Sequence, residues 1–267
     1  MKYALIIISC IVSVLSSVAV YAAPVGNIAT PSLLKKGIVY EKGDTDFIVT
    51  ASGEIDLTFD QNLKHAADDT EYYFFGVKTG LLVADRFMPY AMLGGAAANK
   101  QQFQIGSHKV RWDTDYDYAW GLGCTAMVFE KELSSFKQGI LRIGIDGKYR
   151  QSFLDVNKVK LDDNTALKAN DPNLIEAVYE LKQWQTAVGI SYQINQMVPY
   201  LGLKYSGSAG RASANISSGE FVNKFANKYN VGIFLGGDFV VNDSFTLNIE
   251  GRFIDETALS ISGATRF

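Results

Sequence analysis

Charged side chains recur at every second position in several segments of this 267-residue chain. Glu54 and Asp56 show the spacing most clearly, because the residues on either side of each are apolar or glycine. Side chains two positions apart share one face of a β-strand, and charges that face a channel tune its ion selectivity. A network of ion pairs filling a narrow interior is the alternative reading. The candidates for lining a pore are Glu54, Asp56, Lys78, Asp117, Arg142, Asp146, Lys148, Arg150, Lys204, Asp238, Glu250, Arg252 and Arg266.

The two histidines offer a second kind of chemistry, with thinner support. His65 stands near Asp68 and Asp69, which would provide a base with carboxylate neighbours for a proteolytic site. Such a cluster in a loop is far more often solvated than catalytic, and Ser107 next to His108 is too little for acyl chemistry. Two histidines also make a histidine-rich metal site improbable. We therefore predict no enzyme, no metal and no cofactor.

The elements that would position the charges are strands, because hydrophobicity alternates with a period of two along most of the chain. About ten strands are expected, with twelve as the alternative, each near the length of a tilted membrane strand. They cover residues 49–60, 73–83, 88–97, 117–128, 141–150, 185–194, 198–205, 229–239, 245–253 and 259–267. The pattern predicts an all-β fold, a transmembrane antiparallel β-barrel.

The connections between these strands alternate in length, as they do in outer-membrane barrels with short periplasmic turns and longer outer loops. Short turns fall at 85–86, 130–137, 195–197 and 242–243, and longer loops at 61–70, 99–115, 151–173 and 206–226. Aromatic residues near the strand ends suit interfacial girdles, namely Tyr72, Tyr73, Tyr90, Trp120, Trp184, Tyr200 and Tyr229. A soluble β-sandwich also alternates. Here, however, the polar face is rich in glycine and alanine, as in a crowded lumen.

The chain divides into three parts by composition. Residues 1–22 have a positive start, a short apolar run and small residues at 20–22, which predicts a signal peptide cleaved after Ala22. Residues 23–45 are read as an exposed, extended lead-in, and 46–267 as the barrel. Loss of Lys2 moves the formal charge from −3 to −4, which argues against nucleic acid as a partner. Cys124 would be the one remaining cysteine, on the lipid face, so no internal disulfide is expected.

Several stretches go beyond general barrel character. They are Pro24–Leu34 followed by Gly37-Ile38, Gly53–Asp56 with Phe59-Asp60 and Leu63-Lys64, Leu181–Tyr192 leading into Pro199–Tyr205, and Glu250–Ala258 with Thr265–Phe267. In this order they resemble the chlamydial major outer membrane protein family. The resemblance implies a porin and major surface protein of the outer membrane, assembled as a homotrimer. This chain departs from that family in two ways. The family's usual members are longer, and they are cysteine-rich, whereas Cys124 is the one cysteine expected in the mature chain.

The sequence therefore predicts an outer-membrane porin and structural envelope protein that lets small hydrophilic solutes or ions diffuse passively. A closed, non-conducting structural or adhesive barrel is the alternative, and an outer-membrane protease a remote one. Expected partners are outer-membrane lipid and the barrel-insertion machinery, which would read terminal Phe267 as its signal. The bore of a barrel widens with the number of strands, and at about ten strands both a conducting and a plugged barrel are compatible with this relation. Pore radius, selectivity, solute identity and the role of the outer loops are not encoded in any motif.

Overall fold

The computed structural model describes residues 23–28, 33, 47–61, 63, 70–105, 108–133, 139–162, 165–168, 171–172, 174–216 and 219–267. Within these residues fourteen strands form one antiparallel sheet. They are β1 (Phe47–Gln61), β2 (Glu71–Val83), β3 (Phe87–Asn99), β4 (Gln101–Ile105), β5 (His108–Thr114), β6 (Asp117–Leu133), β7 (Gly139–Leu161), β8 (Thr165–Lys168), β9 (Leu174–Gln193), β10 (Met197–Ile216), β11 (Gly219–Ala226), β12 (Val231–Asn242), β13 (Phe245–Phe253) and β14 (Glu256–Arg266). The expected signal peptide lies outside the described residues. Among the described residues, no helix is long and apolar enough to cross a membrane.

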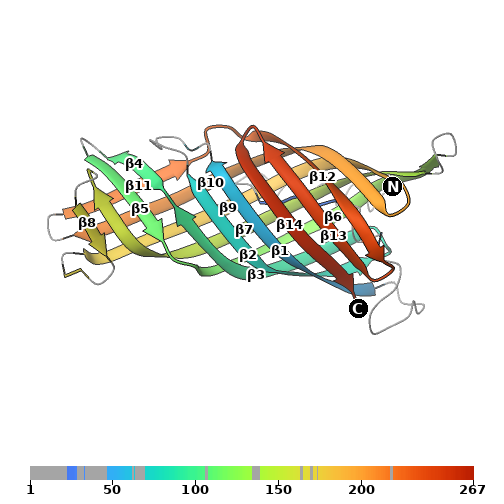
Figure 1. Cartoon of the computed structure of the whole chain (residues 1–267), viewed down its shortest axis with the longest axis horizontal. Coiled ribbons are helices and arrows are strands. Elements are labelled where there is room, and N and C mark those ends of the chain that lie inside the picture. The colour runs from blue at the N-terminus through green and yellow to red at the C-terminus, as the bar shows by residue number, and fades with distance from the viewer. Residues whose placement is uncertain are drawn as a thin grey trace, which may run out of the picture.

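Ten of these strands close into a barrel, which confirms the predicted fold class. β1 pairs with β2 on one side and with β14 on the other, so the first and last strands form the closing seam. The wall runs β1-β2-β3-β6-β7-β9-β10-β12-β13-β14, and its strands are visibly tilted in Figure 1. Each of the ten predicted segments lies on one of these strands.

The wall is apolar on the outside and polar on the inside. Along β1, Val49 and Ile55 are 45% and 52% exposed, whereas Glu54 and Asp56, on either side of Ile55, are buried. The same outward set of large apolar side chains continues on β2, β10, β12 and β14. A β-sandwich would bury these side chains, so the soluble alternative is excluded. The outward band is the surface that outer-membrane barrels present to lipid.

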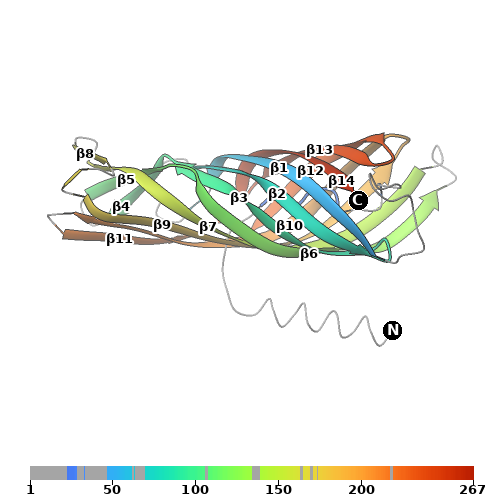
Figure 2. The same ribbon diagram turned by 90° about the horizontal axis from the view of Figure 1, so that it is seen from below.

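Three wall strands project well beyond the rest. β7 has 23 residues and β9 and β10 have 20 each, against 9–13 for β2, β3, β12, β13 and β14. Their extensions carry β4, β5, β8 and β11, which gather at the left-hand end of the molecule in Figures 1 and 2. We call this part the projecting sheet.

The prediction of long outer loops was wrong for three of the four connections. Residues 99–115 form the β4–β5 hairpin, and 151–173 and 206–226 are largely strand. The physical reason is that inward apolar side chains such as Trp112 and Phe225 bury themselves against one another there. Of the connection at 61–70, only Gln61, Leu63 and Thr70 are described. Tight turns at the opposite end, such as Ala84–Arg86 and Asn195–Gln196, agree with the predicted short turns.

Candidate functional site

The interior of the barrel holds the predicted pore-lining residues. Strand parity explains this placement, because each lies on the face opposite the lipid-facing set. Two of the thirteen, Lys78 and Asp117, are only partly buried. Lys78 lies over the ring of Tyr90, and the Asp117 carboxylate accepts a hydrogen bond from the Tyr118 amide. The others are buried: Glu54, Asp56, Arg142, Asp146, Lys148, Arg150, Lys204, Asp238, Glu250, Arg252 and Arg266.

Arg252 is the centre of a belt of ion pairs in the bore. Its guanidinium group lies 2.5 Å from Asp56 on β1, 2.5 Å from Glu256 on β14 and 3.6 Å from Glu250 on β13. Arg252, Asp56 and Glu250 are all fully buried. The Asp56–Arg252 pair joins strands on either side of the closing seam, as the sequence predicted. A second cation, Lys204 on β10, pairs with Glu256 and lies 3.1 Å from Asp255.

Arg150 carries the belt across the lumen. It rises from β7, on the far wall from β1, and its Nη2 lies 3.5 Å from the Asp56 carboxylate. The same guanidinium group donates to Gln183 and lies 4.6 Å and 5.1 Å from the ring centroids of Phe74 and Tyr72. The belt therefore connects opposite walls of the barrel.

The short-turn end of the lumen is occupied by the chain's own residues Ala23–Ile28, which we call the lumenal segment. The amides of Val25 and Gly26 donate to the two carboxylate oxygens of Glu250, at 2.9 Å and 2.8 Å. The Ala23 amide donates to Gln185 at 2.8 Å, and Lys148 donates to the Pro24 carbonyl oxygen. The prediction that this lead-in is exposed was wrong for these residues, because wall side chains satisfy its backbone groups.

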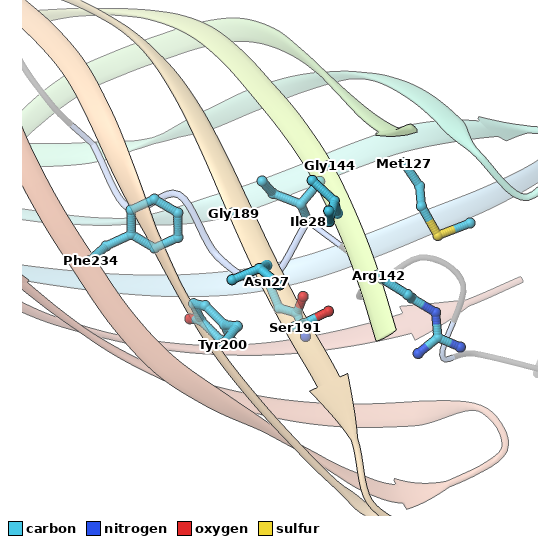
Figure 3. A pocket seen from close by; sticks show the side chains of 11 residues that line it. Asn27, Ile28, Met127, Arg142, Gly144, Gly189, Ser191, Tyr200 and Phe234 are labelled. Atoms are coloured by element: carbon cyan, nitrogen blue, oxygen red, sulfur yellow. The ribbon is translucent and has the colours of Figure 1, made fainter. Parts of the chain in front are cut away.

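Packing holds the lumenal segment as firmly as its hydrogen bonds do. Val25 and Ile28 form a buried cluster with Ala187, Tyr200 and Phe234. Figure 3 shows Ile28 beside Gly144 and Gly189, where a Cβ atom added to Gly189 would lie 3.1 Å from Ile28 Cδ1. The cavity left around Asn27 and Ile28 measures about 10 Å³, room for about one water molecule. The segment thus fills the bore where it lies.

At the outer end the interior becomes apolar. Phe103, Trp112, Tyr179 and Phe225 are buried there, and the rings of Phe103 and Phe225 stack with centroids 5.0 Å apart. The sequence reading expected a wet interior lined by charges and small residues throughout. That expectation was wrong for this end, because the projecting sheet folds over its own apolar face.

Three tyrosines assigned to the aromatic girdles lie inside instead. Tyr72, Tyr90 and Tyr200 are buried, and their hydroxyl groups bond Ser152, Asp146 and Glu250 respectively. The assignment used their closeness to strand ends and overlooked their parity. The remaining girdle candidates, Tyr73, Trp120, Trp184 and Tyr229, are partly or largely exposed.

The sequence reading missed Asp255 and Glu256, which supply half of the belt's carboxylates. Both lie where β13 turns into β14, and the alternating pattern is interrupted there, so parity could not assign them. Their position directly after Arg252 on the chain was the available signal. The reading also missed Asn248, which donates to Asp238 at 2.6 Å and to the Tyr200 hydroxyl at 3.0 Å.

The other candidate chemistry does not gather into a site. His65 and Ser107 lie outside the described residues, and His108 is an exposed residue paired with Asp162 at 2.7 Å. The described residues contain no cluster of His, Cys, Asp or Glu able to hold a metal ion. Cys124 is half-buried on the outward-facing set of β6. Phe267 is 42% exposed beside the seam, where its amide donates to Val49.

Comparison with known proteins finds similarity to chlamydial outer-membrane proteins. The family model described as Chlamydia major outer membrane protein matches residues 91–219. A major outer membrane porin of Chlamydia pneumoniae is 24% identical, with 58% of this chain and 53% of that protein covered. Outer membrane protein B of Chlamydia trachomatis is also 24% identical, with 61% and 49% covered. The chain thus spans about half the length of the curated relatives it matches.

Among solved structures, the outer membrane protein OprG of Pseudomonas aeruginosa is 11% identical, with a TM-score of 0.36 over 84% of this chain and 96% of that one. Ail of Yersinia pestis is 10% identical, with a TM-score of 0.35 over 83% and 97%. These superpositions are loose. The outer-membrane localisation rests instead on the family match, the curated relatives and the lipid-facing band. The protein is an outer-membrane β-barrel that is similar in sequence to the chlamydial major outer membrane proteins.

Proposed function

We propose that the protein is an outer-membrane porin of small conductance, which passes ions or small hydrophilic solutes through its charged interior. Its curated relatives are named porins and outer membrane proteins, and none of those names is that of an enzyme. A ten-strand bore is narrow, so the permeant species would be small. Assembly as a homotrimer and recognition of Phe267 by the insertion machinery belong to the same proposal.

The observation that carries this proposal is the contrast between two levels of the interior. The outer end is filled with apolar side chains, whereas the membrane level is filled with ion pairs around Arg252. Buried ion pairs are not the most stable filling, because apolar residues of similar volume are often neutral or better. In this chain the apolar filling lies at the outer end, and the ion pairs lie at the membrane level. We infer that the ionic lining is kept as a hydrophilic path, opened when the pairs across the bore separate.

The second candidate is a closed structural barrel, and one observation favours it. Asp56 and Arg252 have no solvent-exposed surface, and the lumenal segment and the apolar outer end close the bore on either side of them. If the pairs never separate, the barrel would serve only the strength of the envelope or surface contacts.

Planar-bilayer recording of refolded protein distinguishes the two candidates. Arg150→Gln removes the cation that spans the lumen, and Lys182→Gln removes an outward-facing cation on β9 as the matched control. A porin gives discrete current steps in the parent, more frequent openings in Arg150→Gln, and no change in Lys182→Gln. Absence of current from all three, with circular dichroism showing folded barrels, would establish the closed barrel instead.

A further inference from the structure

The lumenal segment is held by hydrogen bonds to wall side chains in addition to its apolar packing. Four of its hydrogen bonds join it to Glu250, Gln185 and Lys148, which belong to three different wall strands. Both oxygens of one buried carboxylate are used on consecutive amides. Charge-assisted bonds of this kind are roughly twice as strong as neutral ones. The wall also leaves space for the segment, since Gly144 and Gly189 face Ile28.

Ala23 becomes the amino terminus of the mature protein when the signal peptide is cleaved after Ala22, as the sequence predicts. Cleavage after residue 22 adds water across the Ala22–Ala23 peptide bond; the leader leaves with a new carboxylate, and the Ala23 amine takes up a proton. An α-amino group in water has a pKa near 8 and is mainly charged at neutral pH. Burial opposes the charged form, so an ammonium group in the lumen needs acceptors and carboxylates around it. The Ala23 nitrogen is buried in the lumen, where it already donates to Gln185.

The surroundings of Ala23 suit a cation with additional N–H donors. Lys148 lies in the field of three carboxylates, Asp146, Glu54 and Glu250, and of one other cation, Lys78. Glu54 Oε1 and Asp146 Oδ1 are buried and receive no hydrogen bond from the described residues. A buried acceptor without a donor costs about 1–3 kcal/mol. The ammonium group formed by cleavage carries two more donors than the amide it replaces. Lys148, which donates to the neighbouring Pro24 carbonyl oxygen, lies 3.7 Å from Asp146 Oδ1, so these acceptors lie near the amino terminus.

We propose that the lumen is a docking site for the processed amino terminus: the α-ammonium group of Ala23 and the backbone of Pro24–Ile28 are its ligand, and the docked segment closes the short-turn end. The docking depends on cleavage after residue 22. The closing role rests on the proposed porin function, whereas the docking itself does not.

Thiol labelling tests the docking directly. The protein is prepared from Ala23 onward with Cys124→Ala as background, refolded in lipid vesicles, and given a cysteine either at Ile28 or at the exposed turn residue Asp243. A membrane-impermeant maleimide should label Ile28→Cys at least about tenfold more slowly than Asp243→Cys, since it reacts only during local opening. Equal rates would overturn the docking.

Two further arms separate the contributions. Acetylating the α-amino group of the same protein removes its charge without lengthening the chain, and should speed labelling of Ile28→Cys about tenfold. An unchanged rate would remove the α-ammonium group from the proposal. Glu250→Gln leaves only one acceptor oxygen for the Val25 and Gly26 amides, and should also speed labelling; an unchanged rate would count against the docking.

Conductance then reports on closure alone. Deleting residues 24–28 should raise the current over that of the parent if the segment closes the bore. Equal currents would overturn the closing role and leave the porin proposal standing. Slow labelling of Ile28→Cys without current from either protein would instead support the docking and overturn the porin function.

Discussion

Asp56→Asn is the sharpest test of how the interior is stabilised. The carboxylate has no exposed surface, and it lies 2.5 Å from the Arg252 guanidinium and 3.5 Å from that of Arg150. Arg252 keeps Glu256 at 2.5 Å when Asp56 is neutralised. Arg150 loses its one carboxylate partner within the described residues and keeps Gln183 and two aromatic rings.

The expected loss follows from these partners. Breaking a buried ion pair by removing one member costs about 3–5 kcal/mol. Because Arg252 is still paired, the loss in Asp56→Asn should lie at the lower end, about 3 kcal/mol. Since 1.36 kcal/mol corresponds to a factor of ten, the unfolding equilibrium constant should rise roughly a hundredfold.

Equilibrium urea unfolding in lipid vesicles measures this loss, with Asp243→Asn in an exposed turn as the control. The double variant Asp56→Asn, Arg150→Gln removes the stranded cation together with its partner. It should recover at least about 1 kcal/mol relative to the sum of the single variants. A loss below about 1 kcal/mol for Asp56→Asn, or strict additivity in the cycle, would refute the idea that Arg150 depends on Asp56.

Three further predictions concern the projecting sheet. Trp112→Ala should destabilise the protein by about 3–5 kcal/mol, whereas Trp112→Phe should cost clearly less, because the buried indole N–H has no acceptor among the described residues; urea unfolding checks both. Lys160→Glu should stabilise by about 0.2–1 kcal/mol, less in high salt, because Lys160 stands directly opposite Arg111. Hydrogen bonds from His108 and the Lys109 amide lower the pKa of the Asp162 carboxyl below its usual 3.8. A depressed carboxyl pKa contributes stability above its unfolded value that is lost as pH falls through the folded value. The protection of the Lys109 amide against hydrogen exchange, measured relative to the unstructured chain, should therefore fall only below about pH 4.

The strands were predictable because alternation at period two is a strong local signal. Parity placed Asp56 and Arg252 on the inner face, and closure of the sheet brought them together at the seam. The same rule, applied to Tyr90 or Tyr200, would have moved both from the girdles into the lumen. The error came from using position along the strand without parity.

The lumenal segment could not be predicted from local pattern. Residues 23–28 have no periodicity, and their partner Glu250 lies 225 positions from Val25 along the chain. Only the closed barrel reveals that this carboxylate is available. The β4–β5 hairpin differs, because Val110 and Trp112 alternate with Lys109, Arg111 and Asp113. The signal was present there but was outweighed by the number of charges.

On strand β7 the alternation of polar and apolar side chains reverses its direction along the strand. From Arg142 to Ser152 its inward residues are polar except for a glycine, and its outward residues are mostly apolar. From Leu154 the inward residues are apolar, and outward Asp155 follows the exposed apolar Phe153. Lipid outside lets apolar side chains face outward and leaves polar ones to pair inside. Water outside restores the ordinary arrangement, in which burial of apolar side chains drives folding. The same inversion occurs on β10, where inward Lys204 and Ser206 give way to buried Ala212 and Ala214. Strands β7 and β10, on either side of β9, thus change in the same register. We infer that the outer membrane surface lies near Phe153 and that the projecting sheet beyond it faces water.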